Sequence, residues 1–217
     1  MSDDVNSPAV AVQADSRVQA GELDWCKGDG LLPAVVQDAD TLRVLMLGYM
    51  NAESLARTLA SGKVTFYSRS KQRLWTKGET SGHVLELVGI ETDCDNDTLL
   101  VLARPHGNTC HLDRPSCFPT APGDFLAELS ALVAQRERER PFGSYTTKLF
   151  EQGIRRIAQK VGEEGVETAL AGVAQDDPEL LGEAADLIYH LIVLLRSRGL
   201  SLAQVVDVLV QRHATAG

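Results

Sequence analysis

The side chains best suited to metal chemistry form two groups, one in each half of this 217-residue sequence. In the first half, Cys94 lies within the acidic segment 93–97, and Cys110 and Cys117 follow it. Thiolates are soft ligands that suit Zn²⁺, and three protein ligands leave a fourth position for water, whose pKa zinc lowers to about 7. The three cysteines are therefore candidate zinc ligands, whereas Cys26 has no companion nearby and is predicted to be structural.

The same acidic segment predicts a second metal. Asp93, Asp95 and Asp97 alternate, so in an extended chain they share one face, opposite Cys94. Three carboxylates on one face make a hard oxygen site that suits Mg²⁺. From spacing alone, buried intracellular cysteines beside an acidic loop explain these residues equally well, because the gaps match no common zinc-finger pattern.

A basic stretch precedes this segment. Residues 63–78 carry five lysines and arginines and no acidic residue, in a chain whose net charge is −9. Such a local excess favours phosphate binding, although a solvated surface is an equal alternative. Trp75 has the flat ring that stacks on a base, although tryptophan is more often used in packing. Acid–base candidates in this half are His83, His106 and His111.

In the second half, carboxylates recur at helical spacing. Glu163, Glu164 and Glu167 are three or four residues apart, and Glu183 and Asp186 are three apart. Two such pairs on antiparallel helices can converge on divalent cations. Around the second pair the sequence is mostly apolar, so its carboxylates are expected to be partly buried and to need a compensating cation. An acidic solvated face is the alternative.

The elements that position these groups change character near residue 118. The first half reads as mostly β structure with one helix, capped by Asn51 and ended by Gly62. After a linker the pattern is helical, with Pro178 at the start of one helix after Asp177, Gly199 at its end, and Ser201 capping the last helix. The predicted strands cover 32–37, 41–47, 64–68, 83–91 and 99–103, and the predicted helices cover 51–61, a stripe from 125 to 133, 146–174, 177–198 and 201–213. The expected fold is a two-domain one, with an α+β domain and an all-α helical bundle.

Bulk composition narrows the function classes. A net charge of −9 argues against nucleic acid as a partner. The longest apolar stretch is too short to cross a bilayer, and the N-terminus shows no secretion signal, so we expect a cytoplasmic protein without disulfides or a membrane partner. The expected domains are an arm of residues 1–20 without order, a first domain at 21–118, a linker at 119–124 and a second domain at 125–217.

Both halves resemble known enzyme families. Residues from about 31 to 118 resemble phosphoribosyl-AMP cyclohydrolase, through FYSRS at 66–70, LWTKGETSGH at 74–83, DCDND at 93–97, CH at 110–111 and SCF at 116–118. Residues from about 125 to 213 resemble phosphoribosyl-ATP pyrophosphohydrolase, an all-α nucleotide pyrophosphohydrolase, through KVGEEGVE at 160–167 and EAAD at 183–186. Together the halves resemble the bifunctional fusion of histidine biosynthesis.

The resemblance implies two reactions on phosphoribosyl nucleotides. The second half would cleave phosphoribosyl-ATP to phosphoribosyl-AMP and pyrophosphate, and the first half would then open the adenine ring between N1 and C6. Zinc on the three cysteines would activate the attacking water, His111 would transfer the proton, and Asp93, Asp95 and Asp97 would hold magnesium. In the family the zinc cysteines come from two subunits, which implies a homodimer.

The resemblance also implies the remaining site residues. Magnesium in the second half would be held by Glu164, Glu167, Glu183 and Asp186, with Glu163 as a further ligand or a base. The residues expected to contact substrate are Arg69, Arg73, Trp75, Lys77, His83 and Lys160.

Three other readings compete with this one. A zinc-dependent base deaminase shares the chemistry, but the His-x-Glu and Pro-Cys-x-x-Cys motifs of that class are absent. A metal-binding interaction module without turnover would hold its zinc structurally. A nucleotide pyrophosphohydrolase of broader specificity would differ only in the substrates that it accepts.

Overall fold

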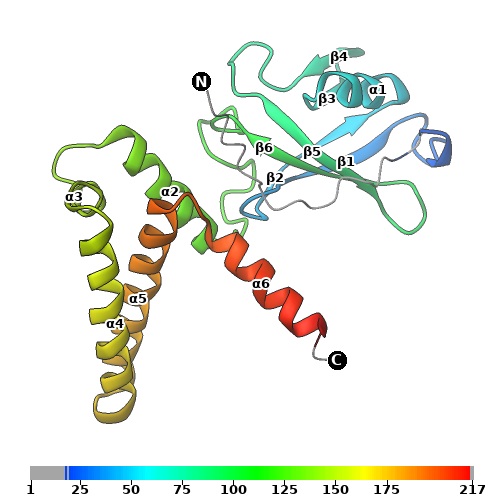
Figure 1. The fold of residues 1–217 in the computed structure, drawn as a ribbon. Helices are drawn as coiled ribbons and strands as arrows, with labels where there is room; N and C mark the ends of the chain where they lie inside the picture. The colour runs from blue at the N-terminus through cyan, green and yellow to red at the C-terminus, as the bar shows by residue number, and fades with distance from the viewer. Residues whose placement is uncertain (1–17, 19, 216–217) are drawn as a thin grey trace, which may run out of the picture. The chain divides into compact units, whose positions relative to one another are not determined.

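The structure is a computed structural model, and it describes residue 18 and residues 20–215. These residues form two compact units that divide between Phe125 and Leu126 (Figure 1). The arm predicted at residues 1–20 lies outside the described residues except for Val18, which packs against the core of the first unit, and Ala20, where a short 3-10 helix, η1 (Ala20–Glu22), begins.

The first unit is built on a four-stranded sheet in the order β2-β1-β6-β5. Its central strands, β1 (Leu32–Asp38) and β6 (Leu99–Pro105), are parallel, and the outer strands β2 (Val44–Met50) and β5 (Leu85–Thr92) are antiparallel to their neighbours. A separate hairpin pairs β3 (Thr65–Ser68) with β4 (Arg73–Thr76). The mostly β character predicted for this half is confirmed.

One helix, α1 (Ala52–Ser61), connects β2 to β3, as its caps predict. The side chain of Asn51 accepts the backbone N–H of Ser54, and Gly62 ends the helix in the left-handed region at φ 67°. The buried hydroxyl of Thr58 accepts the N–H of Thr65 at 2.9 Å, which fastens the helix to β3. The helix is therefore anchored at both ends and along its buried face.

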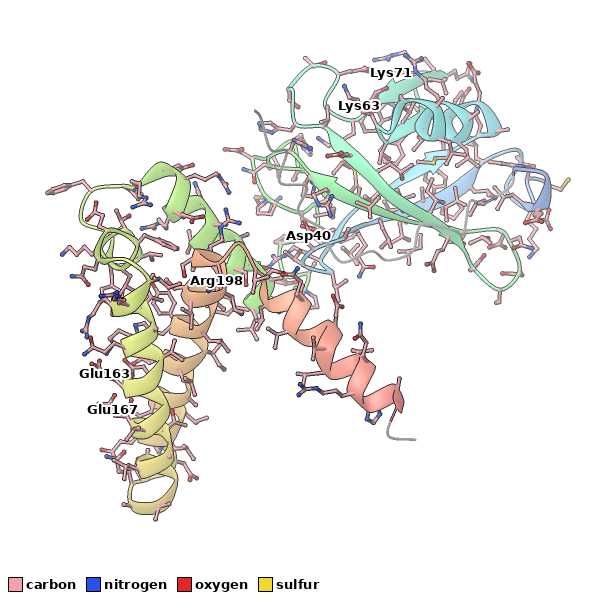
Figure 2. All side chains as sticks on the ribbon, in the orientation of Figure 1. Asp40, Lys63, Lys71, Glu163, Glu167 and Arg198 are labelled. Atoms are coloured by element: carbon pink, nitrogen blue, oxygen red, sulfur yellow. The ribbon has the colours of Figure 1, made fainter. Side chains whose placement is uncertain are left out.

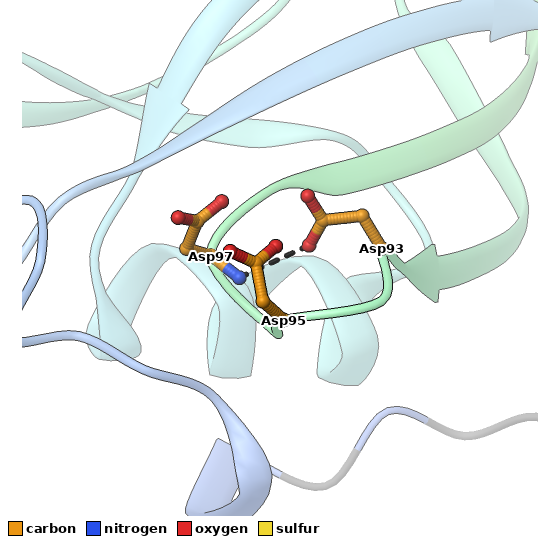
Figure 3. Close-up of side chains that lie close together, drawn as sticks. All are labelled: Asp93, Asp95 and Asp97. Atoms are coloured by element: carbon orange, nitrogen blue, oxygen red, sulfur yellow. Dashed lines mark hydrogen bonds between the residues drawn. The ribbon is translucent and has the colours of Figure 1, made fainter.

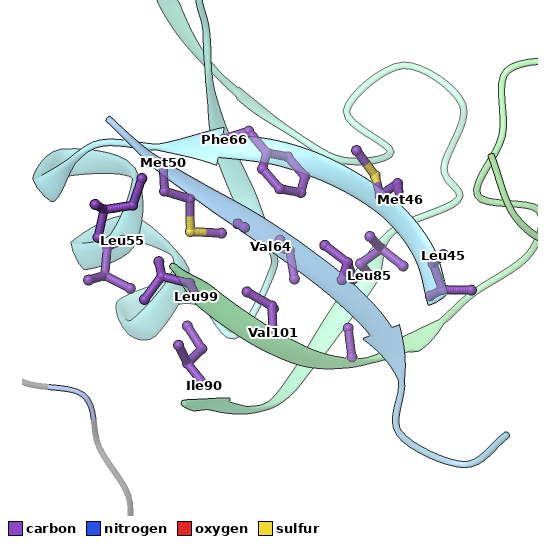
Figure 4. Packing of buried hydrophobic residues seen from close by; sticks show 14 of the residues in the cluster. Leu45, Met46, Met50, Leu55, Val64, Phe66, Leu85, Ile90, Leu99 and Val101 are labelled. Carbon is purple, nitrogen blue, oxygen red and sulfur yellow. The ribbon is translucent and has the colours of Figure 1, made fainter. Parts of the chain in front are cut away.

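The core of the first unit lies between the sheet, α1 and β3 (Figure 4). Alternate residues of β1 are buried, as expected for a strand with one face on a core. Phe66 is the largest fully buried side chain and packs at 5.0 Å from the ring of Trp75 across the hairpin. The core thus positions β4 and the loop that follows it.

Gly48→Ala is expected to lower the free energy of unfolding of this unit by about 1–3 kcal/mol, the usual cost of overpacking a core. A Cβ built at Gly48 would come within 2.3 Å of the Phe66 ring. Chemical denaturation followed by tryptophan fluorescence measures the loss, because both tryptophans lie in this unit. Gly89→Ala is the control, since its Cβ would come no nearer than 4.0 Å to Leu102; equal losses at both positions would contradict the explanation.

The second unit is helical, as predicted. Its described residues form α2 (Phe125–Glu139), α3 (Tyr145–Gln152), α4 (Ile154–Ala174), α5 (Asp177–Ser197) and α6 (Leu202–Thr215). The long helices α4 and α5 are antiparallel and pack side by side (Figure 1). A small core draws on the first four helices, with Leu202 of α6 packed against it; its buried members are Val133, Leu149, Ile157, Ile192 and Val193.

Several boundaries differ from the predicted ones. The strand predicted at 41–47 begins later, at Val44, because Asp38 accepts backbone N–H groups of a turn at residues 40–41. The helix predicted at 146–174 is broken at Gly153, whose φ of 82° and ψ of 172° are not helical. The cap of α5 is Asp176 rather than Asp177, because Asp176 and Glu179 form a reciprocal capping box.

No helix in the described part of the chain has the length and apolarity needed to cross a membrane.

Candidate functional site

A pocket of about 580 Å³ opens in the first unit, beside the β3–β4 hairpin. This volume lies in the range of small-molecule sites. Two loops form most of its wall, one that follows β4 and one that follows β6. The lining residues predicted from the sequence are Arg73, Trp75, Lys77, His83, Cys110, His111 and Cys117.

The two pocket cysteines are held by their loop. The backbone N–H of Cys110 donates to the carbonyl of Arg114 at 2.9 Å, which closes a tight turn. Cys117 donates its N–H to the carbonyl of Leu45 in β2, and the preceding Ser116 hydroxyl donates to Val44 at 2.7 Å. The backbone of both cysteines is therefore held in place by hydrogen bonds within the chain.

The thiols of Cys110 and Cys117 interact directly, and their surroundings favour one thiolate. The pKa of Cys110 is lowered, chiefly by the hydrogen bond from the Leu112 N–H and further by the thiol of Cys117 and by Arg114. Burial raises the pKa of Cys117, and its neighbour Cys110 raises it further. A cation would let both ionise, because its charge offsets their repulsion.

Two glycines shape the wall around His83. The Nδ1 of His83 lies 3.2 Å from the carbonyl oxygen of Asn108. Because a carbonyl only accepts, a neutral ring carries its proton on Nδ1 and leaves Nε2 as an acceptor. A Cβ at Gly107 would meet the imidazole at 2.8 Å, and one at Gly78 would meet the His83 backbone at 2.5 Å. The ring can occupy this place only because both positions are glycine.

The basic residues of the pocket are partly engaged. The Nη2 of Arg73 lies 3.0 Å from Glu79, whose other oxygen accepts the N–H of Thr76. Arg73 is the main cause of the lowered pKa of Glu79, and the hydrogen bond from the Thr76 N–H lowers it further. The Glu79 carboxylate therefore stays ionised and links the loop after β4 to the strand. Arg69 does not line the pocket, because its guanidinium stacks on the ring of Tyr49 at 3.7 Å.

Sequence reasoning missed much of the polar lining. Lys71, one of the basic residues of the stretch 63–78, lines the pocket at the turn of the hairpin (Figure 2). The small polar residues of the wall were not predicted. The missed residues with hydroxyl or amide groups are Ser68, Thr76, Thr80, Ser81, Asn108 and Thr109. Thr80 and Ser81 had a signal in the sequence, because they stand between two glycines, Gly78 and Gly82, which both take positive φ. Such loops bring polar groups and backbone N–H groups to an anion.

The three aspartates lie together, but for a different reason from the one predicted. Residues 93–98 form a turn between β5 and β6, not an extended strand. One oxygen of Asp93 accepts the N–H groups of Asp97 and Thr98, each at 3.0 Å, which folds the turn and draws the carboxylates of Asp93, Asp95 and Asp97 together (Figure 3). One oxygen of each lies within 4.8 Å of the others. The donor set is hard oxygen and fits Mg²⁺.

Cys94 shares this turn and does not join the pocket. It is exposed, and its thiol contacts the carboxylate of Asp95. Among the described residues, it is absent from the lining that holds Cys110 and Cys117. The three cysteines predicted as zinc ligands are therefore not brought together within the described chain.

In the second unit, α4 and α5 bring carboxylates together. One oxygen each of Glu164, Glu167 and Glu183 lies within 4.8 Å of the others. Of the predicted ligands, Asp186 is outside this group. Burial also differs from expectation: Glu164 on α4 is only 4% exposed, whereas Asp186 on the apolar helix α5 is exposed, because one chain leaves much of that helix uncovered.

Charges around this group set the protonation of each carboxyl. Lys160 lies 2.5 Å from Glu164 and is the main cause of its lowered pKa. Glu163 contacts Arg156 and Gln159 as well as Lys160, and Lys160 is the main cause of its lowered pKa. The pKa of Glu167 is raised, first by desolvation and then by Glu164 and Glu183. A divalent cation would relieve that repulsion.

A buried histidine completes this centre and was not predicted. His190 of α5 is 3% exposed, and its Nδ1 lies 2.8 Å from the carbonyl of Asp186 and 3.7 Å from Glu164. Its Nε2 lies 3.0 Å from the hydroxyl of Tyr145 on α3. Three helices therefore meet at this ring.

Comparison with known proteins assigns each half. Residues 46–119 match the family Phosphoribosyl-AMP cyclohydrolase, and residues 126–213 match Phosphoribosyl-ATP pyrophosphohydrolase. The histidine biosynthesis bifunctional protein HisIE of Xanthomonas campestris is 78% identical over 191 residues, which cover 88% of this chain and 93% of that protein. HisIE of Salmonella typhimurium and HisIE of Escherichia coli are each 59% identical over 197 residues, which cover 90% of this chain and 97% of either protein. The chain therefore belongs to the HisIE family of bifunctional histidine-biosynthesis enzymes, which join a phosphoribosyl-AMP cyclohydrolase to a phosphoribosyl-ATP pyrophosphohydrolase.

Proposed function

We propose that each activity of this bifunctional hydrolase belongs to one half and depends on its own metal centre. The helical domain, residues 125–217, cleaves phosphoribosyl-ATP to phosphoribosyl-AMP and pyrophosphate. The domain at 21–118 then opens the adenine ring at N1–C6, and residues 119–124 link the two. The observation that carries the proposal is the separation of two donor sets, a thiol pair in a polar pocket and a carboxylate group on two helices. Family membership decides against a base deaminase and against a module without turnover.

The cyclohydrolase centre is assigned to the pocket and to the cysteine turn of a partner chain. Thiols fit zinc, and Cys110 and Cys117 already lie together, so Cys94 of a second copy completes the set. Zinc, when bound there, supplies activation of water at neutral pH. The aspartates of the same turn, Asp93 and its two neighbours in Figure 3, are assigned to magnesium.

The remaining pocket residues hold the substrate and move its proton. His111 follows a zinc ligand in the chain and lines the pocket, so it is placed to transfer the proton during ring opening. Lys77, Arg73 and Lys71 supply positive charge for the phosphate, and Trp75 supplies a flat wall for the base. His83 presents Nε2 as an acceptor. Arg69 is assigned no direct contact with substrate, because its guanidinium stacks on the ring of Tyr49 in β2.

The pyrophosphohydrolase centre is assigned to the helical carboxylates. Glu164, Glu167 and Glu183 form the group that fits magnesium, and Asp186 lies one turn from Glu183 on the same helix. Magnesium, when bound, neutralises the triphosphate and the developing charge on the leaving pyrophosphate. Glu163 stays ionised beside Lys160 and is proposed to orient water. Lys160 is proposed to release its carboxylate partners, Glu163 and Glu164, and to bind a phosphate oxygen of the substrate.

The exposed apolar residues of the helical unit support a homodimer. On α4 and α5 the described single chain leaves Val166, Leu170, Val173, Leu181 and Ile188 exposed. Apolar helix faces of this kind are covered in stable proteins, and a symmetric second copy is the commonest cover. Cys94 supports a homodimer as well, because it lies outside the pocket of its own chain and could join Cys110 and Cys117 only from a second copy.

Subunit complementation tests the shared zinc site. Cys94→Ala and Cys110→Ala proteins should each lack ring opening, but their co-expression should restore about a quarter of wild-type activity, because half of the dimers are mixed and each mixed two-fold dimer has one intact site of two. Tandem affinity tags isolate the mixed dimer, and pyrophosphate release serves as the internal control. No restoration in a verified mixed dimer would place all three cysteines within one chain.

A further inference from the structure

The acidic turn carries an internal cation that the proposed chemistry does not use. The Nζ of Lys27 lies 2.6 Å from Asp95 and 3.2 Å from Asp97. Lys27 lies between η1 and β1, 68 residues before Asp95, so no local sequence pattern links the two. Both of its partners belong to the three-carboxylate group assigned to magnesium.

The backbone around Lys27 is fastened to the same turn. The N–H of Asp24 donates to the carbonyl of Asn96 at 2.8 Å. One oxygen of Asp24 accepts the N–H of Cys26 at 3.1 Å and that of Lys27 at 3.4 Å. The lysine is thus presented to the aspartates by a segment whose backbone is hydrogen-bonded to Asn96 of the same turn, and not only by its own side chain.

Electrostatics explains why a cation stands there. Three carboxylates with oxygens within 4.8 Å of one another repel, and the Asp95 and Asp97 side chains are 55% and 31% exposed, so water screens this only in part. One ammonium offsets part of the charge. Magnesium would bind carboxylates of the same group at about 2.0–2.1 Å, and its double charge would repel the ammonium group held against them.

We propose that Lys27 is a tethered counter-ion of the aspartate turn, which holds the turn in the metal-free chain and is displaced when a divalent cation binds. Cation binding is then an exchange, and Lys27 sets its affinity. Cys94, a proposed zinc ligand, lies between Asp93 and Asp95 in the same turn. The ion pairs of Lys27 therefore also hold the backbone of Cys94 in the metal-free chain. The inference rests on the proposed magnesium role of the turn.

The second acidic group has the same arrangement. Lys160 contacts Glu163 at 3.0 Å and Glu164 at 2.5 Å, and Glu164 is one of the three carboxylates that converge on α4 and α5. A lysine therefore accompanies each acidic group in the described chain. The Lys27 pair is the better one to test, because Lys160 is also assigned to substrate.

The test is a Mg²⁺ titration by calorimetry on the full chain, in a Glu167→Gln background that disables the helical group. Lys27→Gln should bind Mg²⁺ about threefold to tenfold more tightly than the background protein, because two partly exposed ion pairs no longer compete. Without Mg²⁺ the same variant should melt at a lower temperature, and saturating Mg²⁺ should remove that difference. Lys63→Gln is the matched control, since it removes the same charge from the same unit, and it should change neither quantity.

Each outcome decides something. Equal or weaker Mg²⁺ affinity in Lys27→Gln, with binding that Asp95→Asn abolishes, would overturn the exchange while leaving magnesium on the turn. The absence of any binding heat that Asp95→Asn removes would overturn both the magnesium role and the exchange. An affinity gain shared by Lys63→Gln would reduce the effect to net charge and would also overturn it.

Discussion

Replacing Cys110 by alanine is expected to abolish ring opening of phosphoribosyl-AMP and to leave pyrophosphate release from phosphoribosyl-ATP intact. The thiol is buried in the pocket wall, and its hydrogen bond from Leu112 and its contact with Cys117 favour the thiolate that a zinc ion needs. A metal that activates water supplies several kcal/mol, and each 1.36 kcal/mol is a factor of ten in rate, so the loss should be at least about 1,000-fold.

Two assays with separate substrates measure this result. Absorbance of the purine follows ring opening when phosphoribosyl-AMP is supplied directly, and a pyrophosphate assay follows the other reaction. Metal analysis should show zinc lost from Cys110→Ala. Cys26→Ala is the matched control, because Cys26 is an exposed cysteine outside the pocket, and it should keep its zinc and both activities.

The opposite outcome would be equally clear. If a folded Cys110→Ala protein retained ring opening, the pocket cysteines would not be the reaction centre. If it lost pyrophosphate release as well, the two centres could not be independent. Circular dichroism and the melting temperature separate either result from misfolding.

Local signals in the sequence predicted local structure well. Asn51 and Gly62 delimit α1 because capping depends on residues three or four positions apart. The break at Gly153 had a local signal too, since glycine tolerates the φ of 82° that ends α3, but the helix-forming residues on both sides outweighed it. Helical spacing placed Glu164 and Glu167 on one face for the same local reason.

Contacts between distant residues were beyond the sequence pattern. Strand β4 was missed because its stability comes from pairing with β3 and from Trp75 packing on Phe66, not from alternation. The aspartates met through the cap that Asp93 provides, and Lys27 joined them from 68 residues away. His190 gave no signal, because its role depends on Tyr145 of another helix.

Replacing Glu167 by glutamine is expected to reverse the Cys110 result, with pyrophosphate release reduced at least about 100-fold and ring opening retained. Glu167 supplies one of three converging carboxylates, and an amide is a weak ligand for magnesium. Loss of a metal that neutralises the triphosphate removes several kcal/mol of transition-state stabilisation, at 1.36 kcal/mol per factor of ten. The pyrophosphate assay at several Mg²⁺ concentrations measures the loss.

The same variant makes a second, opposite prediction about stability. The pKa of Glu167 is raised above its ordinary value by desolvation and by Glu164 and Glu183, so the folded state holds its proton more tightly than the unfolded state does. Stability therefore falls as pH rises through that raised pKa, and the cost is fully present once the pH is above it. Glu167→Gln removes the charge, so without Mg²⁺ it should melt at a higher temperature than the wild type at pH 7, and the difference should shrink in acid below the ordinary pKa.

Glu151→Gln on α3 is the matched control, because it is an exposed helical glutamate outside the carboxylate group. It should change neither activity nor the pH dependence of melting. A Glu167→Gln protein that is less stable at pH 7 without Mg²⁺, yet still inactive in pyrophosphate release, would mean that the carboxylate supports the fold and not the metal. Higher stability together with lost activity is the signature of a site whose repulsion is maintained for a cation.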